Sequence, residues 1–167
     1  MTTNKGDLLH RLCCEQWPLE PRTHLDVGAG QGETTVFLAA MAQQQGAVFA
    51  FESNQENWPA LMRHCATGQN QNRATIAVHP LMIRRTAGII KTPEGSVRMV
   101  ALDDMTYPHP VELIRINIAS CELEVIAGGL QTILKHQPRM LIRVSSESHR
   151  QRLLALCKVY GWHSESW

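Results

Sequence analysis

His-Leu-Asp-Val-Gly-Ala-Gly-Gln-Gly-Glu-Thr-Thr, residues 24–35, joins an apolar strand pattern to the start of a helix through three alternating glycines. The strand pattern contains Asp26 near its end. A turn from a strand into a helix brings bare backbone close to a ligand. Glycine suits such a turn because it lacks a Cβ and readily adopts a positive φ. Gly28, Gly30 and Gly32 therefore predict a ligand-binding turn, with a plain tight connection as the alternative.

The spacing of these glycines disfavours a phosphate ligand. The dinucleotide-binding fingerprint places its third glycine at position 33, where this chain has Glu33. A carboxylate there suits the start of a helix but repels a pyrophosphate, which argues against a nicotinamide-dependent oxidoreductase. A glycine turn flanked by acids favours a cationic nucleoside, and S-adenosylmethionine carries a sulfonium and an ammonium group. We expect Asp26 to face that ammonium group.

A second acid lies where such a cofactor needs one. Residues 47–52, Ala-Val-Phe-Ala-Phe-Glu, form a short apolar run that ends in a carboxylate. An acid about twenty residues after the glycines, at the end of the second strand, bonds the ribose hydroxyls in this kind of fold. Glu52 is the predicted ribose ligand. Asp26 and Glu52 also have a structural interpretation, in which they cap helices or accept backbone hydrogen bonds.

Length and composition indicate a globular protein. We expect residues 1–167 to form a single domain, with a leading helix and connector over 1–22 and the core over 23–167. The net charge of +1, from 16 basic and 15 acidic residues, argues against a nucleic acid or an anionic membrane as partner. Five cysteines without paired C-x-x-C spacing argue against a disulfide framework or a zinc site, and they favour a reducing cytoplasm.

Strand and helix patterns alternate along the chain. Strands are expected at 23–28, 47–52, 74–79, 112–118 and 139–145, and helices at 6–17, 33–44, 54–67, 121–136 and 147–160. Residues 86–101 predict a hairpin around Pro93-Glu94-Gly95, and residues 162–167 predict the start of a last strand. The alternation predicts an α/β, Rossmann-like fold: a mostly parallel sheet with helices on both faces and a ligand crevice at the carboxyl ends of the strands.

Four sequence blocks, in the right order, resemble the FkbM-type methyltransferases, a branch of the class I S-adenosylmethionine-dependent enzymes. The family's Asp-Val-Gly-Ala-Asn-x-Gly is similar to residues 26–32, with Gly30 in place of Asn, and its Phe-Glu-Pro-Asn-x-x-Asn is similar to residues 51–57. Its Leu-Asp-Asp matches residues 102–104, and its Ile-Lys-Ile-Asp-Val-Glu-Gly-x-Glu shares the frame of residues 114–122. The resemblance implies the class I methyltransferase fold. We expect its closing C-terminal hairpin to be missing, because the chain ends where related folds add it.

The resemblance also implies a cofactor, a reaction and a set of site residues. The cofactor is S-adenosylmethionine, and the reaction is O-methylation of a hydroxyl group on a small molecule or saccharide. Glu122, Asp103 and His79 are the candidates for orienting or deprotonating that acceptor. Each has a structural alternative: an acid in the first turn of a helix for Glu122, a cap or turn for Asp103, and packing for His79. The expected cofactor-binding residues are Asp26, Gly28, Ala29, Gly30, Gly32, Glu52, Ser53, Leu81 and Asn117.

The fourth block departs from the family at the acceptor side. Arg115 stands in place of the family's Lys, Asn117 in place of its Asp, and Ala119 in place of its first Glu; in the later strand Arg143 stands in place of a Glu. An Asn side chain cannot take a proton, and Ala119 can neither take one nor bind a metal. The alternative function is therefore a catalytically degenerate family member that acts as a cofactor-binding or protein-binding module.

Two further features bear on partners. Arg115 and Arg143, on neighbouring predicted strands, are expected either to form an anion-binding pair or to make salt bridges with Glu122 or Glu124. A sheet without its closing hairpin exposes a strand edge, and we expect a second copy of the chain or another protein to bind there.

Overall fold

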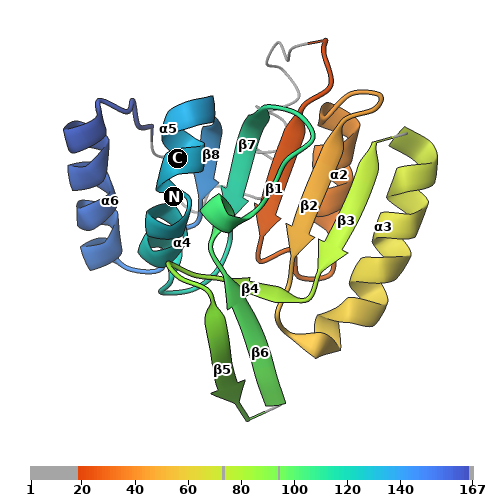
Figure 1. Ribbon diagram of the computed structural model, residues 1–167, viewed down its shortest axis with the longest axis horizontal. Coiled ribbons are helices and arrows are strands. Elements are labelled where there is room, and N and C mark those ends of the chain that lie inside the picture. Colours follow the sequence, from red (N-terminus) through yellow and green to blue (C-terminus); the bar gives the residue numbers. More distant parts are fainter. Residues whose placement is uncertain (1–18, 73, 94, 166–167) are drawn as a thin grey trace.

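A five-stranded parallel sheet is the centre of the computed structural model, which describes residues 19–72, 74–93 and 95–165 (Figure 1). Its spatial order is β3-β2-β1-β7-β8. Four of the five strands lie within their predicted ranges and β7 begins one residue before its range, so the predicted α/β, mostly parallel fold is confirmed. The leading helix predicted at 6–17 lies outside the described residues. The strands are β1 (Thr23–Val27), β2 (Ala47–Phe51), β3 (Thr75–His79), β7 (Val111–Ile116) and β8 (Arg139–Ile142).

Helices cover both faces of this sheet, and each face has its own apolar core (Figure 1). On one face α2 (Glu33–Met41) and α3 (Trp58–Asn72) pack against β1, β2 and β3. On the other face lie α4 (Glu122–Gly128) and α5 (Leu130–His136), with α6 (Glu147–Tyr160) beside α4. Helices on both faces shield the central strand from solvent, which explains why all five residues of β1 are buried although Thr23, His24 and Asp26 are polar.

The strand order reverses at β1. β2 and β3 follow on one side of this strand, and β7 and β8 follow on the other. In open α/β sheets the ligand crevice lies outside the carboxyl ends of the strands at such a reversal. The turn that leaves β1, which holds the three glycines, is therefore at the position where this architecture binds ligands.

A second, three-stranded sheet extends past the carboxyl edge of the first (Figure 1). It contains β4 (Leu81–Ile83), β5 (Gly88–Thr92) and β6 (Gly95–Val100), in the order β4-β6-β5. β5 and β6 confirm the predicted hairpin at 86–101. β4 was not predicted, because it is only three residues long and pairs in parallel with β6, far from it in the sequence.

The helix predicted at 121–136 is two helices. α4 ends and α5 begins at Gly129, whose backbone has φ −118° and ψ 13° and so interrupts the helical hydrogen bonding. A Cβ at Gly129 would lie 3.0 Å from the Leu102 side chain, which packs against this break. Because the contact comes from a distant segment, the apolar periodicity of the sequence does not reveal the break.

The predicted strand at 162–167 is wrong for its described part. Residues 162–165 are irregular, and residues 166–167 lie outside the described residues. Trp162 stacks on Tyr160 at a ring-centroid distance of 4.9 Å, so the indole packs on the end of α6. Between β8 and residue 165 the only regular element is α6. None of the described helices combines the length and the apolar character that crossing a membrane requires.

Candidate ligand site at the glycine turn

The turn after β1 needs glycine for two different reasons. Gly28 has φ +81°, and a Cβ at this position would overlap the carbonyl oxygen of Asn117 at the end of β7. Gly30 has φ +59°, a left-handed conformation that Asn also adopts, and a Cβ there would meet no atom within 4 Å. Gly28 therefore lets two strand ends approach closely, whereas Gly30 presents bare backbone to open space. This geometry explains how the family's Asn and Gly30 can occupy the same turn position.

The backbone N–H groups of the turn already have acceptors. The Gly28 and Ala29 amides both donate to the Phe51 carbonyl at 3.0 Å, and the Gly32 amide donates to the Ala29 carbonyl at 3.1 Å. The Gly30 amide donates to Glu52 Oε2 at 2.7 Å. Phosphate-binding turns use such amides to hold the anion. With these four amides occupied and a carboxylate beside them, the geometry agrees with the prediction that phosphate is disfavoured.

Glu52 links the end of β2 to the glycine turn. Its Oε2 accepts from the Gly30 amide and its Oε1 accepts from the Asn54 amide, each at 2.7 Å. The residue is 8% exposed, and the Trp58 indole donates to its backbone carbonyl at 3.1 Å. A carboxylate offers about four lone-pair sites, so two remain for ligand hydroxyl groups. The structural interpretation, in which Glu52 accepts backbone hydrogen bonds, is thus observed, and the ribose contact stays a prediction.

Asp26 is fully buried and has internal partners. Thr35, in the first turn of α2, donates to its Oδ2 at 2.6 Å. Arg115 donates to its Oδ1 at 2.5 Å and to the Gly28 carbonyl at 3.3 Å. This pairing follows from the sheet, because Asp26 and Arg115 lie opposite each other in the β1–β7 register. The structure therefore gives Asp26 an arginine and a threonine where the sequence predicts a ligand ammonium group, and the ligand contact stays a prediction.

Arg115 and Arg143 do not act as the sequence suggests. Neither of the predicted glutamate partners contacts Arg115, because its guanidinium binds Asp26. Glu122, one of those glutamates, pairs with His149 instead. Arg143 is exposed one residue beyond β8, and its amide donates to the Ile116 carbonyl at 2.9 Å. The predicted salt bridge from Arg115 to Glu122 or Glu124 is therefore corrected to one with Asp26.

A pocket adjoins the carboxyl end of β2. Ser53 lies in it, directly after Glu52 in the sequence, and Met82 of β4 lies opposite. Leu81, one of the expected cofactor-binding residues, is partly buried against the core and does not line this pocket. Side chains alternate along a strand, which explains why Met82 lines the pocket while its neighbour is turned to the core. The lining residues are Ser53, Asn54, Gln55, Met82, Thr92, Gly95 and Val97.

Asp103 stabilises a helix terminus. Its two carboxylate oxygens accept from the backbone amides of Gln131 and Thr132, at 3.0 and 2.8 Å. These are first-turn amides of α5, which otherwise lack intrahelical acceptors. Asp103 thus caps α5 from a segment 28 residues away in sequence. The capping alternative for this residue is observed, and its role as a catalytic group stays a prediction.

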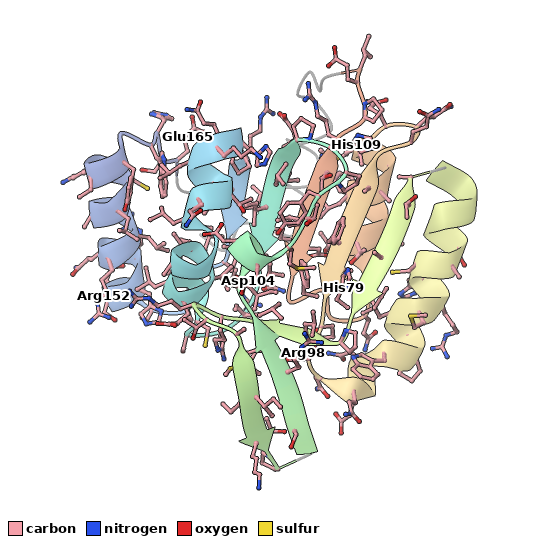
Figure 2. The ribbon with its side chains drawn as sticks, viewed as in Figure 1. His79, Arg98, Asp104, His109, Arg152 and Glu165 are labelled. Carbon is pink, nitrogen blue, oxygen red and sulfur yellow. The ribbon has the colours of Figure 1, made fainter. Side chains whose placement is uncertain are left out.

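His79 ends β3 and is packed between two aromatic rings. Its imidazole stacks on Phe49 and on Phe51, each at a centroid distance of 5.3 Å. Burial lowers the pKa of His79 below its ordinary value, so the ring is neutral at pH 7. Its Nε2 is buried and has no hydrogen-bond partner within the described part of the chain. Figure 2 shows His79 at the carboxyl edge of the sheet, whereas His109 lies at the opposite edge.

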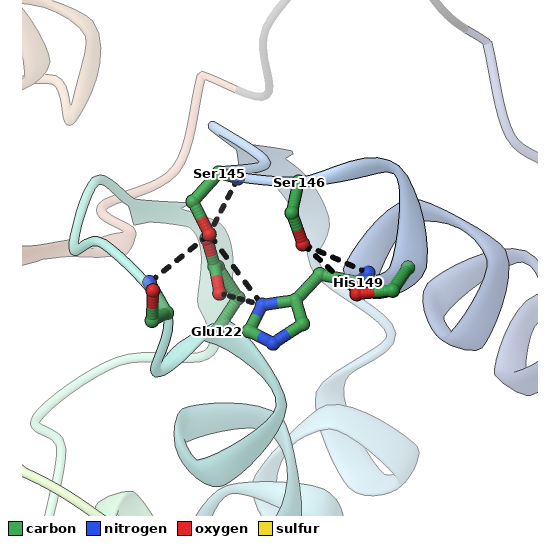
Figure 3. A network of polar contacts seen from close by, with 6 residues as sticks. Glu122, Ser145, Ser146 and His149 are labelled. Atoms are coloured by element: carbon green, nitrogen blue, oxygen red, sulfur yellow. Dashed lines mark hydrogen bonds and ion pairs between the residues drawn. The ribbon is translucent and has the colours of Figure 1, made fainter.

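Glu122 lies in a polar network at the carboxyl ends of β7 and β8 (Figure 3). Its side chain is fully buried; Oε1 accepts from the Ser145 amide at 3.0 Å, and Oε2 lies 2.8 Å from His149 Nδ1. Burial raises the pKa of Glu122, but hydrogen bonds from its own amide, from His149 and from Ser145 outweigh burial and leave the pKa below its ordinary value. Glu122 is therefore an ionised, buried carboxylate.

The sequence patterns did not predict two residues that contact site carboxylates: His149, which contacts Glu122, and Thr35, which contacts Asp26. Each lies in the first turn of a helix that follows a strand, α6 for His149 and α2 for Thr35. Helical side chains point back toward the helix N-terminus, so first-turn residues reach the carboxyl edge of the sheet. Ser146, the N-cap of α6, was the available signal, since it places His149 three residues into that turn.

A parallel sheet of this order, with a glycine turn after its first strand and an acid after its second, defines the fold of the class I methyltransferases. Solved structures share it. Methyltransferase FkbM from Methylobacillus flagellatus KT superposes with a TM-score of 0.67 at 20% identity, over 89% of this chain and 39% of that one. Precorrin-6y C5,15-methyltransferase from Geobacter metallireducens GS-15 superposes with a TM-score of 0.59 at 15% identity, over 95% of this chain and 73% of that one.

A third similar structure holds a ligand. The N-terminal domain of human METTL16, in complex with SAH, superposes with a TM-score of 0.53 at 12% identity, over 93% of this chain and 58% of that one. No family model matches the sequence, and no curated protein matches it. At these identities the likeness establishes the fold, and the FkbM-type resemblance of the sequence blocks agrees with it. The chain spans about two fifths of the length of the FkbM structure, of which it covers 39%.

Proposed function

We propose that this protein binds S-adenosylmethionine at the glycine turn and transfers a methyl group to a hydroxyl of a small molecule or saccharide. The observation that carries the proposal is the junction of Gly30 and Glu52. The Gly30 backbone faces open space there, and the Glu52 carboxylate beside it has lone pairs to spare. Both lie at the carboxyl ends of the parallel strands, next to β1, where the strand order reverses. The methyltransferase structures that share the fold support it.

The residues present fit such a ligand in most respects. Gly30 presents bare backbone to open space, whereas Gly28 and Gly32 lie against packed residues of the protein, and Glu52 has two acceptor sites for ribose hydroxyls. Ser53 lines the adjoining pocket, where an adenine ring would contact Met82 more directly than Leu81. Asn117 lies against the turn through its carbonyl. A contact between Asp26 and the ligand ammonium group requires Arg115 to move, because Arg115 now neutralises that carboxylate.

The bound ligand would supply an electrophilic methyl group on a sulfonium, and the protein must remove the acceptor proton. A hydroxyl is a weak nucleophile until a base takes that proton. Asn117 and Ala119, at the positions of the family's acids, provide no base. Of the proposed catalytic residues, Asp103 has both oxygens engaged at α5, and His79 has its free nitrogen buried between aromatic rings. Glu122 has an accessible partner, His149.

Methyl transfer from S-adenosylmethionine to a panel of hydroxylated small molecules and saccharides tests the proposal. We expect product that carries one added methyl group, together with S-adenosylhomocysteine in equal amount, from the native chain. A folded chain that releases neither product with any acceptor of the panel contradicts the catalytic part of the proposal.

A second function has its own observation in favour. Asp26, the acid expected to contact the cofactor, is paired with Arg115 instead. At the acceptor side, Asn117 and Ala119 replace the two acids of the family pattern. A cofactor-binding or protein-binding module without catalysis would keep the fold and lose these groups. Restoring them with Asn117→Asp and Ala119→Glu separates the two functions. Methyl transfer in the restored chain alone favours the module, and methyl transfer in the native chain rejects it.

We further propose a reducing cytoplasm as the compartment and a protein contact at the sheet edge. Cys65, Cys121 and Cys157 are free thiols in the described structure. β8 ends the strand order of the described sheet, and a second copy of the chain or another protein would pair with its outer edge. Sedimentation or size-exclusion measurement of the mass in solution tests the dimer; a monomer at all concentrations contradicts it.

A further inference from the structure

The network at the ends of β7 and β8 fixes one histidine in a defined state (Figure 3). Glu122 is an ionised carboxylate with no exposed surface, so its Oε2 can only accept a hydrogen bond. His149 Nδ1, 2.8 Å away, must therefore be the donor. A neutral imidazole that carries its proton on Nδ1 has a lone pair on Nε2. Glu122 thus selects the tautomer of His149 in which Nε2 is basic.

The Nε2 atom of His149 is reachable. The side chain is 19% exposed, and Nε2 has no hydrogen-bond partner among the described residues. Among the described residues, Nε2 of His79 is buried without a hydrogen-bond partner, and Nε2 of His149 is not one of these buried atoms. His149 therefore offers an accessible lone pair, whereas His79 offers a buried one.

A short loop connects the network to the glycine turn. Asn117, at the end of β7, has its carbonyl against Gly28. Three residues further on, the Ser120 amide donates to Ser145 Oγ at 3.1 Å, and Ser145 in turn contacts both Glu122 and His149. Three extended residues span at most about 11 Å, so Ser120 lies within that distance of Asn117. Both features lie at the carboxyl edge of adjacent strands.

We propose that His149 is the general base for the methyl acceptor and that Glu122 is its positioning residue; the inference rests on the proposed function. As the acceptor oxygen bonds the methyl carbon, the carbon–sulfur bond of the donor breaks and its electron pair stays on sulfur. The hydroxyl proton passes to Nε2 of His149. The imidazolium that results is stabilised by the Glu122 carboxylate at Nδ1. This pair supplies the base that Asn117 and Ala119 do not.

Two side chains in the described part of the chain contact the His149 imidazole. Glu122 of α4 is the carboxylate that faces its Nδ1, and Ser145 is the other neighbour, with Oγ at 3.5 Å. Within α6, Glu147 pairs with Arg150 at 3.3 Å, so these two charges largely compensate each other.

The test compares His149→Gln and Glu122→Gln with His163→Gln, a histidine whose side chain is 88% exposed near the C-terminus. We expect His149→Gln to lower kcat by about 10²-fold or more, with the Kd for S-adenosylhomocysteine unchanged and the acid limb of the pH profile lost. Glu122→Gln should lower kcat less, and His163→Gln should behave as the native chain. Circular dichroism confirms that each variant is folded.

A second readout does not depend on activity. Imidazole ¹⁵N NMR of the native chain should show His149 with its proton on Nδ1, and Glu122→Gln should shift the ring toward a mixture of tautomers. A proton on Nε2 in the native chain overturns the inference. So does a folded His149→Gln variant with native kcat and pH profile, in which case methyl transfer by the native chain leaves the proposed function intact. A native chain that binds S-adenosylhomocysteine but methylates nothing counts against both proposals.

Discussion

Gly28 and Gly30 are two residues apart and have opposite tolerance for a side chain. At Gly28 a Cβ would overlap the backbone of Asn117, and the backbone has φ +81°. Gly28→Ala should therefore lower the free energy of unfolding by about 2–5 kcal/mol, from left-handed strain plus overpacking. Gly30→Asn, the residue of the family pattern, should change it by less than about 1 kcal/mol. Urea unfolding measures both, and equal losses contradict the assignment.

His24 makes folding sensitive to acid. Burial lowers its pKa from 6.5 to about 4, partly offset by a hydrogen bond with the Leu38 carbonyl. The folded state resists protonation, so the stability contribution is complete above pH 6.5 and is lost as the pH falls toward 4. The loss should reach about 3 kcal/mol.

His24→Gln provides the comparison for this effect. Because the variant has no imidazole to protonate, its stability relative to the native chain should rise as the pH falls through that window. Unfolding in urea at several pH values measures the difference. A difference that stays constant from neutral pH to the folded pKa of His24 contradicts the account.

At the level of elements, one buried ion pair links the side chains of β1 and β7. Arg115 holds a carboxylate that is fully buried. Arg115→Met should cost about 3–5 kcal/mol, because it leaves the Asp26 charge buried and uncompensated. Arg115→Lys keeps the charge and should cost clearly less. Chemical unfolding distinguishes the two variants, and similar small losses for both would mean that Asp26 does not need its arginine.

The start of α5 depends on a residue from another segment. Asp103 accepts from two first-turn amides of this helix, and Asp103→Ala should cost about 1–2 kcal/mol, the usual value of a lost cap. The adjacent Asp104 is exposed and makes one long bond of 3.4 Å to the Ala101 amide, so Asp104→Ala is the matched control. Thermal unfolding compares them; an equal effect of the two substitutions argues against the cap.

For the whole molecule, the sequence predicts those features that depend on local patterns. The five parallel strands, the glycine turn and the hairpin follow from periodicity and turn residues close together in the chain. The features it misses depend on contacts between distant segments. Arg115 meets Asp26 only through the sheet register, 89 residues apart, and His149 meets Glu122 27 residues apart. The break at Gly129 likewise depends on Leu102 and Asp103 from an earlier segment.

The site differs from the sequence prediction in the same way. The residue types were identified, but their partners were not. Glu52 and Asp103 each have both oxygens on backbone amides, and Asp26 is paired inside the protein. The sequence pattern of a carboxylate at a strand end is the same whether the carboxylate binds a ligand or caps a turn. Because both carboxylates have the same two lone-pair sites to spare, the open space at Gly30 distinguishes the Glu52 junction from the Asp103 cap.

Calorimetric titration of the folded chain with S-adenosylhomocysteine tests the glycine-turn site most directly. The account predicts saturable binding that Glu52→Gln weakens by about tenfold or more, the value of a lost charge-assisted hydrogen bond. It also predicts no comparable binding of ADP or NAD⁺, because the amides of the turn are occupied. No heat at millimolar S-adenosylhomocysteine, or binding that Glu52→Gln leaves unchanged, would contradict the account.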